Sequence, residues 1–140
     1  MYYFARVNSI NVVVETVSIS QEESSNYLGN FSEVISVENC VKKFGFNEGD
    51  RWIQTSKDGS IRRKYAGKND IYDEENDRFL PPQPHGAWVF NEETYCYDAP
   101  YPQPELTYEQ RNEGFYYVWE DNEYLLDNTK GWILKKVGEL

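Results

Sequence analysis

The sequence has little of what catalytic and metal-binding sites are commonly built from. Its 140 residues include one histidine, His85, and two cysteines, Cys40 and Cys96, with no CxxC or HExxH spacing. Two cysteines are too few for a disulfide framework, and one histidine without such spacing argues against a zinc site. His85 lies in a loop between Pro84 and Gly86, with no serine or cysteine motif that suggests a nucleophile. We therefore expect no enzyme, no catalytic residue, no metal, no cofactor and two free thiols.

Long apolar runs are also missing. No run approaches the roughly 18 apolar residues of a membrane span. The first residues, MYYFARVNSINVVVETV, lack the charged segment and apolar core of a signal peptide. We expect a protein that is made and folded in a reducing cytoplasm and that binds no membrane.

Aliphatic residues are scarce, whereas aromatic residues are abundant. Hydrophobic residues make up 39% of the chain, below the usual globular share, yet aromatic residues reach 16% and include twelve tyrosines. Aromatic rings on short strands bury much area while a polar tip stays in water. This composition favours a thin β structure or a protein-binding surface over a deep aliphatic core.

Charge is divided unevenly along the chain. Residues 1–68 carry nine Lys and Arg against eight Asp and Glu, whereas residues 69–140 carry five against sixteen. The acidic half is unsuited to nucleic acid, because phosphate contacts need basic patches. Positive charge clusters only in IRRKYAGK, residues 61–68, where Arg62, Arg63, Lys64 and Tyr65 are candidate interaction residues. This segment is either a solvated loop or a contact for an acidic neighbour, including another copy of the chain.

The first third of the chain predicts an α+β arrangement. FARV and VVVETVSI flank NSIN, which indicates a β-hairpin with Asn8 and Asn11 near its turn. Ser20 and Glu23 suggest a capping box before a short helix that Gly29 ends. A second helix over residues 32–45 begins at Ser32, and a strand in RWIQTS follows, ending in the turn KDGS. The apolar face of the second helix is formed by Val34, Val37, Val41 and Phe44.

The rest of the chain predicts a series of hairpins. IYDEENDRFL, WVFNEETYCY and YVWEDNEYLL each combine two aromatic-bearing strands with an acidic turn, and a last strand follows in GWILKKV. All six prolines lie between residues 81 and 104, in PPQP and APYPQP, and predict stiff, extended links. Alternatively, the prolines mark loops and strand edges of one β domain. The predicted fold is mainly β, with an α+β portion over residues 1–58 and an acidic aromatic hairpin region over residues 59–140.

Two further sets of side chains are candidate sites. Asp70, Asp73, Glu74, Glu75 and Asp77 crowd into one segment and could hold calcium, but the glycine that an EF-hand loop requires is missing, which favours a solvated hairpin tip. Aromatic side chains on the predicted hairpins form either the core of a sheet, a protein-binding surface or a platform for carbohydrate. The aromatic candidates are Trp88, Tyr95, Tyr97, Tyr101, Tyr116, Tyr117 and Trp119.

Several phrases occur in an order that resembles a known family. These are FARV followed by a VVxxV strand, RWIQTS, IRRKYAG, YDEENDRFLPPQP, WVFNEET and PYPQP. They are similar to phrases of small virion-associated accessory proteins encoded by cyanophages and other marine tailed phages. The likeness runs from Phe4 to Pro104. It departs from the family at Tyr95 and Tyr97, where tryptophan or leucine is common, and at KDGS, which is shorter than the usual glycine-rich stretch.

The resemblance implies a virion component with no enzymatic role. Together with the aromatic composition and segregated charge, it leads us to expect a phage structural protein located in the virion, most simply a capsid decoration or cement protein that contacts neighbouring capsid subunits. The expected partners are the major capsid protein or tail components, with self-association as a further possibility. The alternatives are a tail or fibre accessory protein and a module that binds glycan through exposed aromatic rings.

Overall fold

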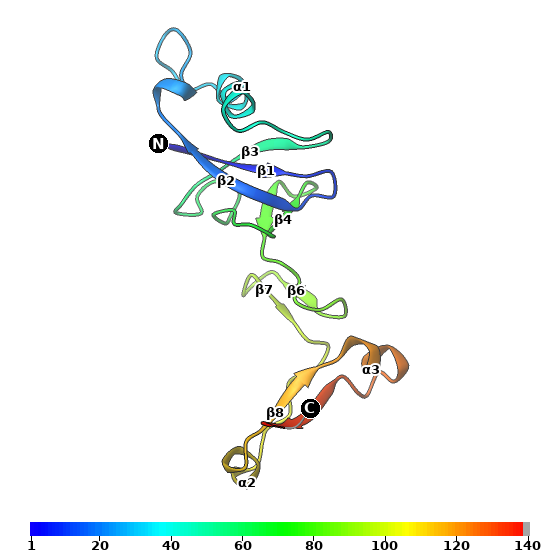
Figure 1. Cartoon of the computed structure of the whole chain (residues 1–140). Helices are drawn as coiled ribbons and strands as arrows, with labels where there is room; N and C mark the ends of the chain where they lie inside the picture. Colours follow the sequence, from blue (N-terminus) through cyan, green and yellow to red (C-terminus); the bar gives the residue numbers. More distant parts are fainter. Residues whose placement is uncertain (139–140) are drawn as a thin grey trace. The chain divides into compact units, whose positions relative to one another are not determined.

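The computed structural model describes residues 1–138 and is mainly β, which confirms the predicted fold class (Figure 1). The chain divides into two compact units, Met1–Pro82 and Gln83–Leu140. The first unit is α+β, and the second consists of hairpins with two short helices. The boundary lies later than the predicted one after residue 58, because residues 59–82 pack onto the sheet of the first unit.

A three-stranded antiparallel sheet organises the first unit. Its strand order is β2-β1-β3, with bounds Val13–Ile19, Tyr2–Val7 and Arg51–Thr55. The predicted hairpin around NSIN is confirmed, since β1 and β2 pair directly. Asn8 accepts a hydrogen bond from the backbone N–H of Val12 at 2.9 Å, and Asn11 adopts a positive φ of 64°. Asparagine tolerates this left-handed conformation better than most residues, which suits both positions to a tight turn.

Helix α1 (Glu33–Phe44) covers one face of this sheet (Figure 1). The predicted N-cap is confirmed, because Ser32 accepts a hydrogen bond from the backbone N–H of Ile35 at 3.3 Å. The predicted apolar face is only partly correct. Val37 and Val41 pack against the cluster of Phe4, Ile19, Cys40 and Trp52, whereas Val34 is 69% exposed and Phe44 37% exposed. The buried positions of α1 are the small residues Ser36 and Cys40, because the sheet already supplies the bulky rings.

The predicted capping box before α1 is present, but the helix it begins is very short. Ser20 and Glu23 exchange hydrogen bonds between side chain and backbone N–H, each of 3.1 Å. The helix is a single 3₁₀ turn, η1 (Glu22–Ser24), and it ends well before Gly29. The backbone is already extended at Ser25, which pairs with Phe31 across a loop.

Residues 59–82 cover the opposite face of the sheet. Strands β4 (Ile71–Asp73) and β5 (Arg78–Leu80) form the first predicted aromatic hairpin, which is confirmed. Tyr72 and Phe79 of this hairpin, with ring centroids 5.4 Å apart, share a buried cluster with residues of the sheet. Thr55 in β3 donates to the carbonyl of Lys64 at 3.1 Å and accepts from the N–H of Ala66 at 3.0 Å, which fastens the segment between them to the sheet.

The second unit contains two antiparallel strand pairs and two short helices. Strands β6 (Val89–Asn91) and β7 (Cys96–Asp98) confirm the second predicted hairpin. The last predicted strand is also confirmed, as β9 (Trp132–Lys136), and it pairs with β8 (Phe115–Trp119). Helices α2 (Tyr108–Asn112) and α3 (Asp121–Leu126) stand before and after β8.

The third predicted hairpin is wrong. The residues read as its turn and second strand, EDNE and YLL, fold instead into α3, and β8 finds its partner after that helix. Asp121 and Glu123 lie in the first turn of α3, where acidic side chains favour the helix dipole, and Leu125 and Leu126 have high helix propensity. The alternation of aromatic and acidic residues was therefore not sufficient to distinguish a strand from this helix.

Replacing Phe79 with alanine tests whether residues 59–82 stabilise the first unit. Phe79 is fully buried against the sheet, so Phe79→Ala is expected to lower the free energy of unfolding by about 3–5 kcal/mol. Val34→Ala, at a 69% exposed position of α1, is the control and should change stability by less than about 0.5 kcal/mol. Urea unfolding followed by circular dichroism measures both. Equal stabilities of the two variants would contradict the packing described above.

Candidate binding surface

A cluster of aromatic rings lies in the second unit, with Trp119 at its centre. The Trp119 side chain is 3% exposed, and four rings surround it. Its ring centroid lies between 5.4 and 6.1 Å from those of Trp88, Tyr101, Tyr124 and Trp132. Three of these contacts are edge-on and the fourth, with Tyr124, is tilted, and the ring quadrupole favours edge-on arrangements. We call these five residues the aromatic cluster.

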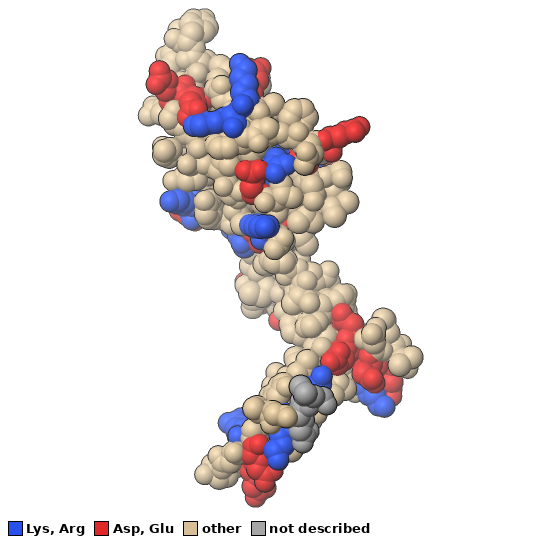
Figure 2. Space-filling view, viewed as in Figure 1, with Lys and Arg blue, Asp and Glu red and all other residues tan. Residues whose placement is uncertain are grey.

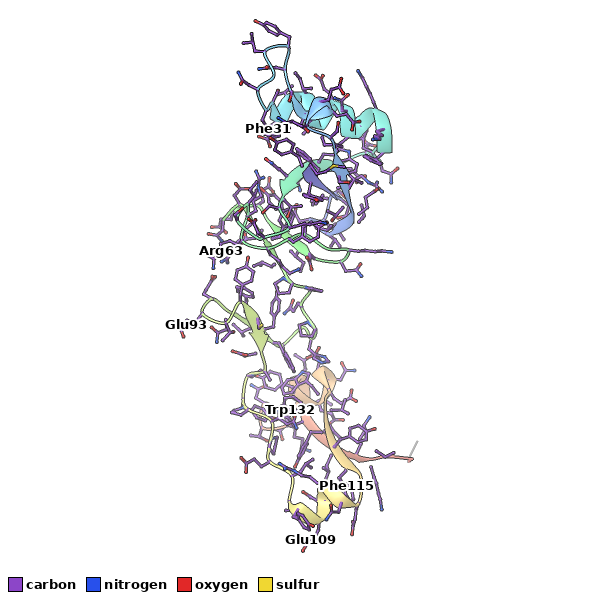
Figure 3. All side chains as sticks on the ribbon, turned by 90° about the vertical axis from the view of Figure 1, so that its left-hand side faces the viewer. Phe31, Arg63, Glu93, Glu109, Phe115 and Trp132 are labelled. Atoms are coloured by element: carbon purple, nitrogen blue, oxygen red, sulfur yellow. The ribbon has the colours of Figure 1, made fainter. Side chains whose placement is uncertain are left out.

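Strand register and one glycine bring the cluster together. Trp119 and Trp132 stand opposite each other at the end of the β8–β9 pair, where Figure 3 marks the position of Trp132. Gly131 has a φ of +136°, and a Cβ atom placed there would lie 2.5 Å from the Trp119 ring. Because no side chain fits at that distance, glycine is required for the indole to lie against the backbone.

Asp121 connects the cluster to the loop before β6. Its carboxylate accepts a hydrogen bond from Nε1 of Trp119 at 2.6 Å and from the backbone N–H groups of Gly86 at 2.8 Å and Ala87 at 3.3 Å. The bond from Trp119 contributes most to lowering the pKa of the carboxyl group, and the two backbone donors and nearby His85 act in the same direction against partial desolvation. Asp121 therefore holds together segments that are more than 30 residues apart in the sequence.

A groove opens beside the cluster. It has a volume of about 470 Å³, and its aromatic walls come from Trp88, Tyr97, Tyr101 and Trp132. Pro100 and Pro102 complete one side, which places part of the predicted proline link in the wall of the groove. The link is held by Trp132, whose Nε1 donates to the carbonyl of Tyr101 at 3.0 Å. Such a groove can receive a flat or extended ligand with apolar faces.

The basic segment of the first unit is arranged differently. Arg62 forms an ion pair with Asp77 at 2.7 Å and donates to the carbonyl of Gln54 at 2.9 Å. Lys64 forms an ion pair with Asp70 at 2.6 Å, and that carboxylate is almost completely buried. These two candidate residues therefore brace the fold in addition to presenting charge.

The other two candidates of that segment lie nearer the surface. Tyr65 is 37% exposed and lies edge-on to Tyr3, with centroids 5.8 Å apart. Arg63 is exposed and has a φ of +70°, and its neighbour Arg62 also has a positive φ. Two successive non-glycine residues in this region are uncommon and carry backbone strain.

The acidic residues considered for calcium do not converge. Asp70, Asp73, Glu74 and Asp77 each form an ion pair with a different basic side chain. Within residues 1–138, no group of three or more His, Cys, Asp or Glu side chains is placed to hold a metal ion. The calcium hypothesis therefore gains no support from the geometry. The two thiols are free as expected, and burial is the main reason that the pKa of Cys40 rises to about 11.

The structure brings together some predicted site residues and separates others. Trp88, Tyr97, Tyr101 and Trp119 meet at the cluster or its groove. Tyr95 lies at the β6–β7 turn against Phe90, with centroids 5.0 Å apart. Tyr116 and Tyr117 lie on β8, where their side chains point to opposite faces.

Sequence reasoning missed two rings of the cluster, Trp132 and Tyr124, and also Asp121, which bonds to the cluster. Trp132 was placed correctly in a strand but not selected, Tyr124 was placed in the third predicted hairpin, and Asp121 was read as part of an acidic turn. The sequence GWILKKV places a tryptophan directly after a glycine at the start of a predicted strand. Because glycine in a strand often marks close packing, this pattern could have identified Trp132. No local pattern distinguishes Asp121 from the other acidic residues around it.

Comparison of the chain with family models, with curated proteins and with solved structures found no match. Among the described residues, every helix is too short or too polar to cross a membrane.

The hydrogen bonds to Asp121 predict a pH-dependent cluster. Because its pKa is lowered from an ordinary value of 3.8, its stabilising effect is complete above that value and is lost as the pH falls through the folded-state pKa. Acid titration followed by tryptophan fluorescence should therefore show a transition below about pH 4. Asp121→Asn should abolish this transition and expose the indoles at neutral pH. Glu123→Gln, at an exposed position of the same helix, should behave as the unmodified protein.

Proposed function

We propose that the chain is a non-enzymatic structural protein of a phage virion, a capsid decoration protein that contacts neighbouring capsid subunits. The motif order from Phe4 to Pro104 supports the virion assignment. The surface of the second unit supports a role in binding other proteins. The capsid lattice is the partner that best suits a small protein with many exposed apolar side chains.

The observation that carries the proposal is the scarcity of burial in the second unit. Among residues 83–138, only Trp119 and Gly131 are buried. A unit of this size ordinarily needs a larger core, a metal, disulfides or a partner for stability. Large hydrophobic side chains are exposed instead, namely Val89, Tyr108, Tyr116, Leu125, Leu126, Leu134 and Val137. Exposed apolar residues in this number mark surfaces that other proteins cover.

Within the second unit, helix α3 carries the most exposed large hydrophobic side chain. Leu125 is 75% exposed and Leu126 is 84% exposed, at the end of a helix whose first turn is acidic. Figure 2 shows acidic side chains over α2 and α3, with basic side chains beside them. Apolar side chains bordered by charged ones give burial on binding and solubility before it. A basic patch on the capsid surface would complement this arrangement.

The copy number per virion is the first measurement. Quantitative mass spectrometry of gradient-purified virions should give a ratio to the major capsid protein near one, or a simple fraction of it. Leu125→Asp combined with Leu126→Asp should reduce incorporation at least about tenfold, because two apolar contacts are lost and charge is added to the contact. Val34→Asp, also at an exposed apolar site, is the control for a general effect of added charge.

A different copy number would change the assignment. A few copies per virion would instead indicate the tail or fibre alternative, with the same surface binding a different partner. Absence from virions would refute the structural proposal altogether.

The aromatic groove favours a second candidate, binding of a glycan. Stacking on Tyr97 and Tyr101 and hydrogen bonds to Asp98 or Gln103 are chemically suited to a neutral sugar. On this hypothesis, Tyr97→Ala lowers affinity for an array-selected oligosaccharide at least about tenfold while the protein stays folded. Tyr108→Ala, 80% exposed and outside the groove, should leave affinity unchanged. Unaltered binding by Tyr97→Ala, or no glycan bound at all, would refute it.

A further inference from the structure

The β8–β9 pair is a sheet of two strands, and the outer edge of each strand is unpaired within the described residues. In an antiparallel pair, residues alternate between those that bond to the facing strand and those whose N–H and C=O point away. The N–H of Glu120 donates to Gly131, and the N–H of Val137 donates to Gly114. Even-numbered residues from 114 to 120 therefore bond inward. Phe115 and Tyr117 direct their backbone groups outward from β8.

The two edges of this sheet differ in how they are protected. Natural edge strands are commonly blocked by lysine, proline or a bulge. Strand β9 carries Lys135 and Lys136, the residue type common on protected edges, although their ammonium groups reach across to the β8 side. Lys135 forms an ion pair with Glu120 at 3.3 Å, and Lys136 lies 5.4 Å from the centroid of the Phe115 ring. Strand β8 has the sequence FYYVW, with no charge and no proline, and its register with β9 runs without a shift. Strand β8 thus has a regular, uncharged edge made of residues with high β-propensity.

The charge of the second unit indicates which chain would occupy this edge. Residues 83–140 carry eleven Asp and Glu against four Lys and Arg, a net charge of −7 with His85 neutral. Glu109 and Glu113 lie just before β8, where Figure 3 marks Glu109 and Phe115. The second unit of another copy would bring the same negative net charge and be repelled. A basic extended segment would be attracted.

We propose that the outer edge of β8 receives an extended, lysine- or arginine-bearing segment of another virion protein as an added strand. Main-chain hydrogen bonds to Phe115 and Tyr117 supply the pairing, and Tyr116 and Tyr117 contact side chains of the added strand on the two faces. This inference rests on the proposed structural function. The partner is expected to offer an exposed, extended basic segment and not a folded surface.

Nuclear magnetic resonance of the ¹⁵N-labelled full chain tests this directly. The probe is a short peptide in which valine and lysine alternate, and its counterpart has glutamate in place of lysine. The lysine peptide should shift the amide signals of Phe115 and Tyr117 most, with smaller shifts at Tyr116 and Val118. The glutamate peptide should bind at least about tenfold more weakly.

Proline at opposite positions of the hairpin provides matched variants. Tyr117→Pro removes an outward N–H of β8, and Leu134→Pro removes the outward N–H directly across the pair, on the other edge. Tyr117→Pro should weaken the lysine peptide at least about tenfold, and Leu134→Pro less than about twofold. If Tyr117→Pro unfolds, Tyr116→Lys adds a lysine to β8, keeps its backbone donors and should give the same loss.

Four results would overturn the inference. Three of these are amide shifts centred on the groove instead of on β8, equal losses of binding in the two proline variants, and equal binding of the lysine and glutamate peptides. The fourth is a shift of the β8 amides that depends on protein concentration without any peptide, which would assign the edge to a second copy of the chain. Virion copy number is measured independently. Peptide binding at β8 by a protein that is absent from virions would refute the structural function while retaining the edge as a binding site.

Discussion

The second unit depends on the burial of one indole ring. Trp119 is its only large side chain withdrawn from water among the described residues, and it is in contact with four other rings. Three neighbouring residues make this burial possible. Gly131 leaves room for the ring, Trp132 lies opposite it on β9, and Asp121 accepts the hydrogen bond from its indole N–H. A buried indole donor without a partner would be costly, so the carboxylate is as necessary as the packing. The chain achieves a core here without aliphatic residues.

The first unit has a larger buried core and adds polar bonds that fix an irregular segment onto it. Its sheet is covered on one side by α1 and on the other by an irregular segment, 59–70, which has no helix or strand of its own. Irregular backbone on a core is stable only when its polar groups are paired. Thr55, Arg62 and Lys64 provide that pairing through bonds to backbone carbonyls and to Asp77 and Asp70. The basic residues are therefore structural as well as surface features.

Local patterns predicted most of the elements but not how they pack. Asn8 and Asn11, Ser32 and the first two aromatic hairpins were predicted correctly, because turn and cap chemistry depends on neighbouring residues. The third hairpin failed because the acidic first turn and the leucines of residues 121–126 favour a helix, and the bonds from Gly86 and Ala87 to Asp121 come from residues far away in sequence. The same limit applies to the site: aromatic candidates were identified by composition, whereas their convergence on Trp119 depends on the β8–β9 register. Long-range pairing of this kind leaves no periodic signature.

The distribution of charge in the second unit bears on which partner the proposed edge of β8 selects. A net charge of −7 over residues 83–140 repels other copies of the unit, and β9 carries two lysines. Strand β8 itself carries no charged side chain, so its discrimination between partners relies on the net charge of the unit. A negative or neutral strand gains little there, whereas a basic one gains both attraction and main-chain pairing. Selectivity of this kind uses repulsion of unwanted partners together with attraction of one class, and it requires no preformed pocket.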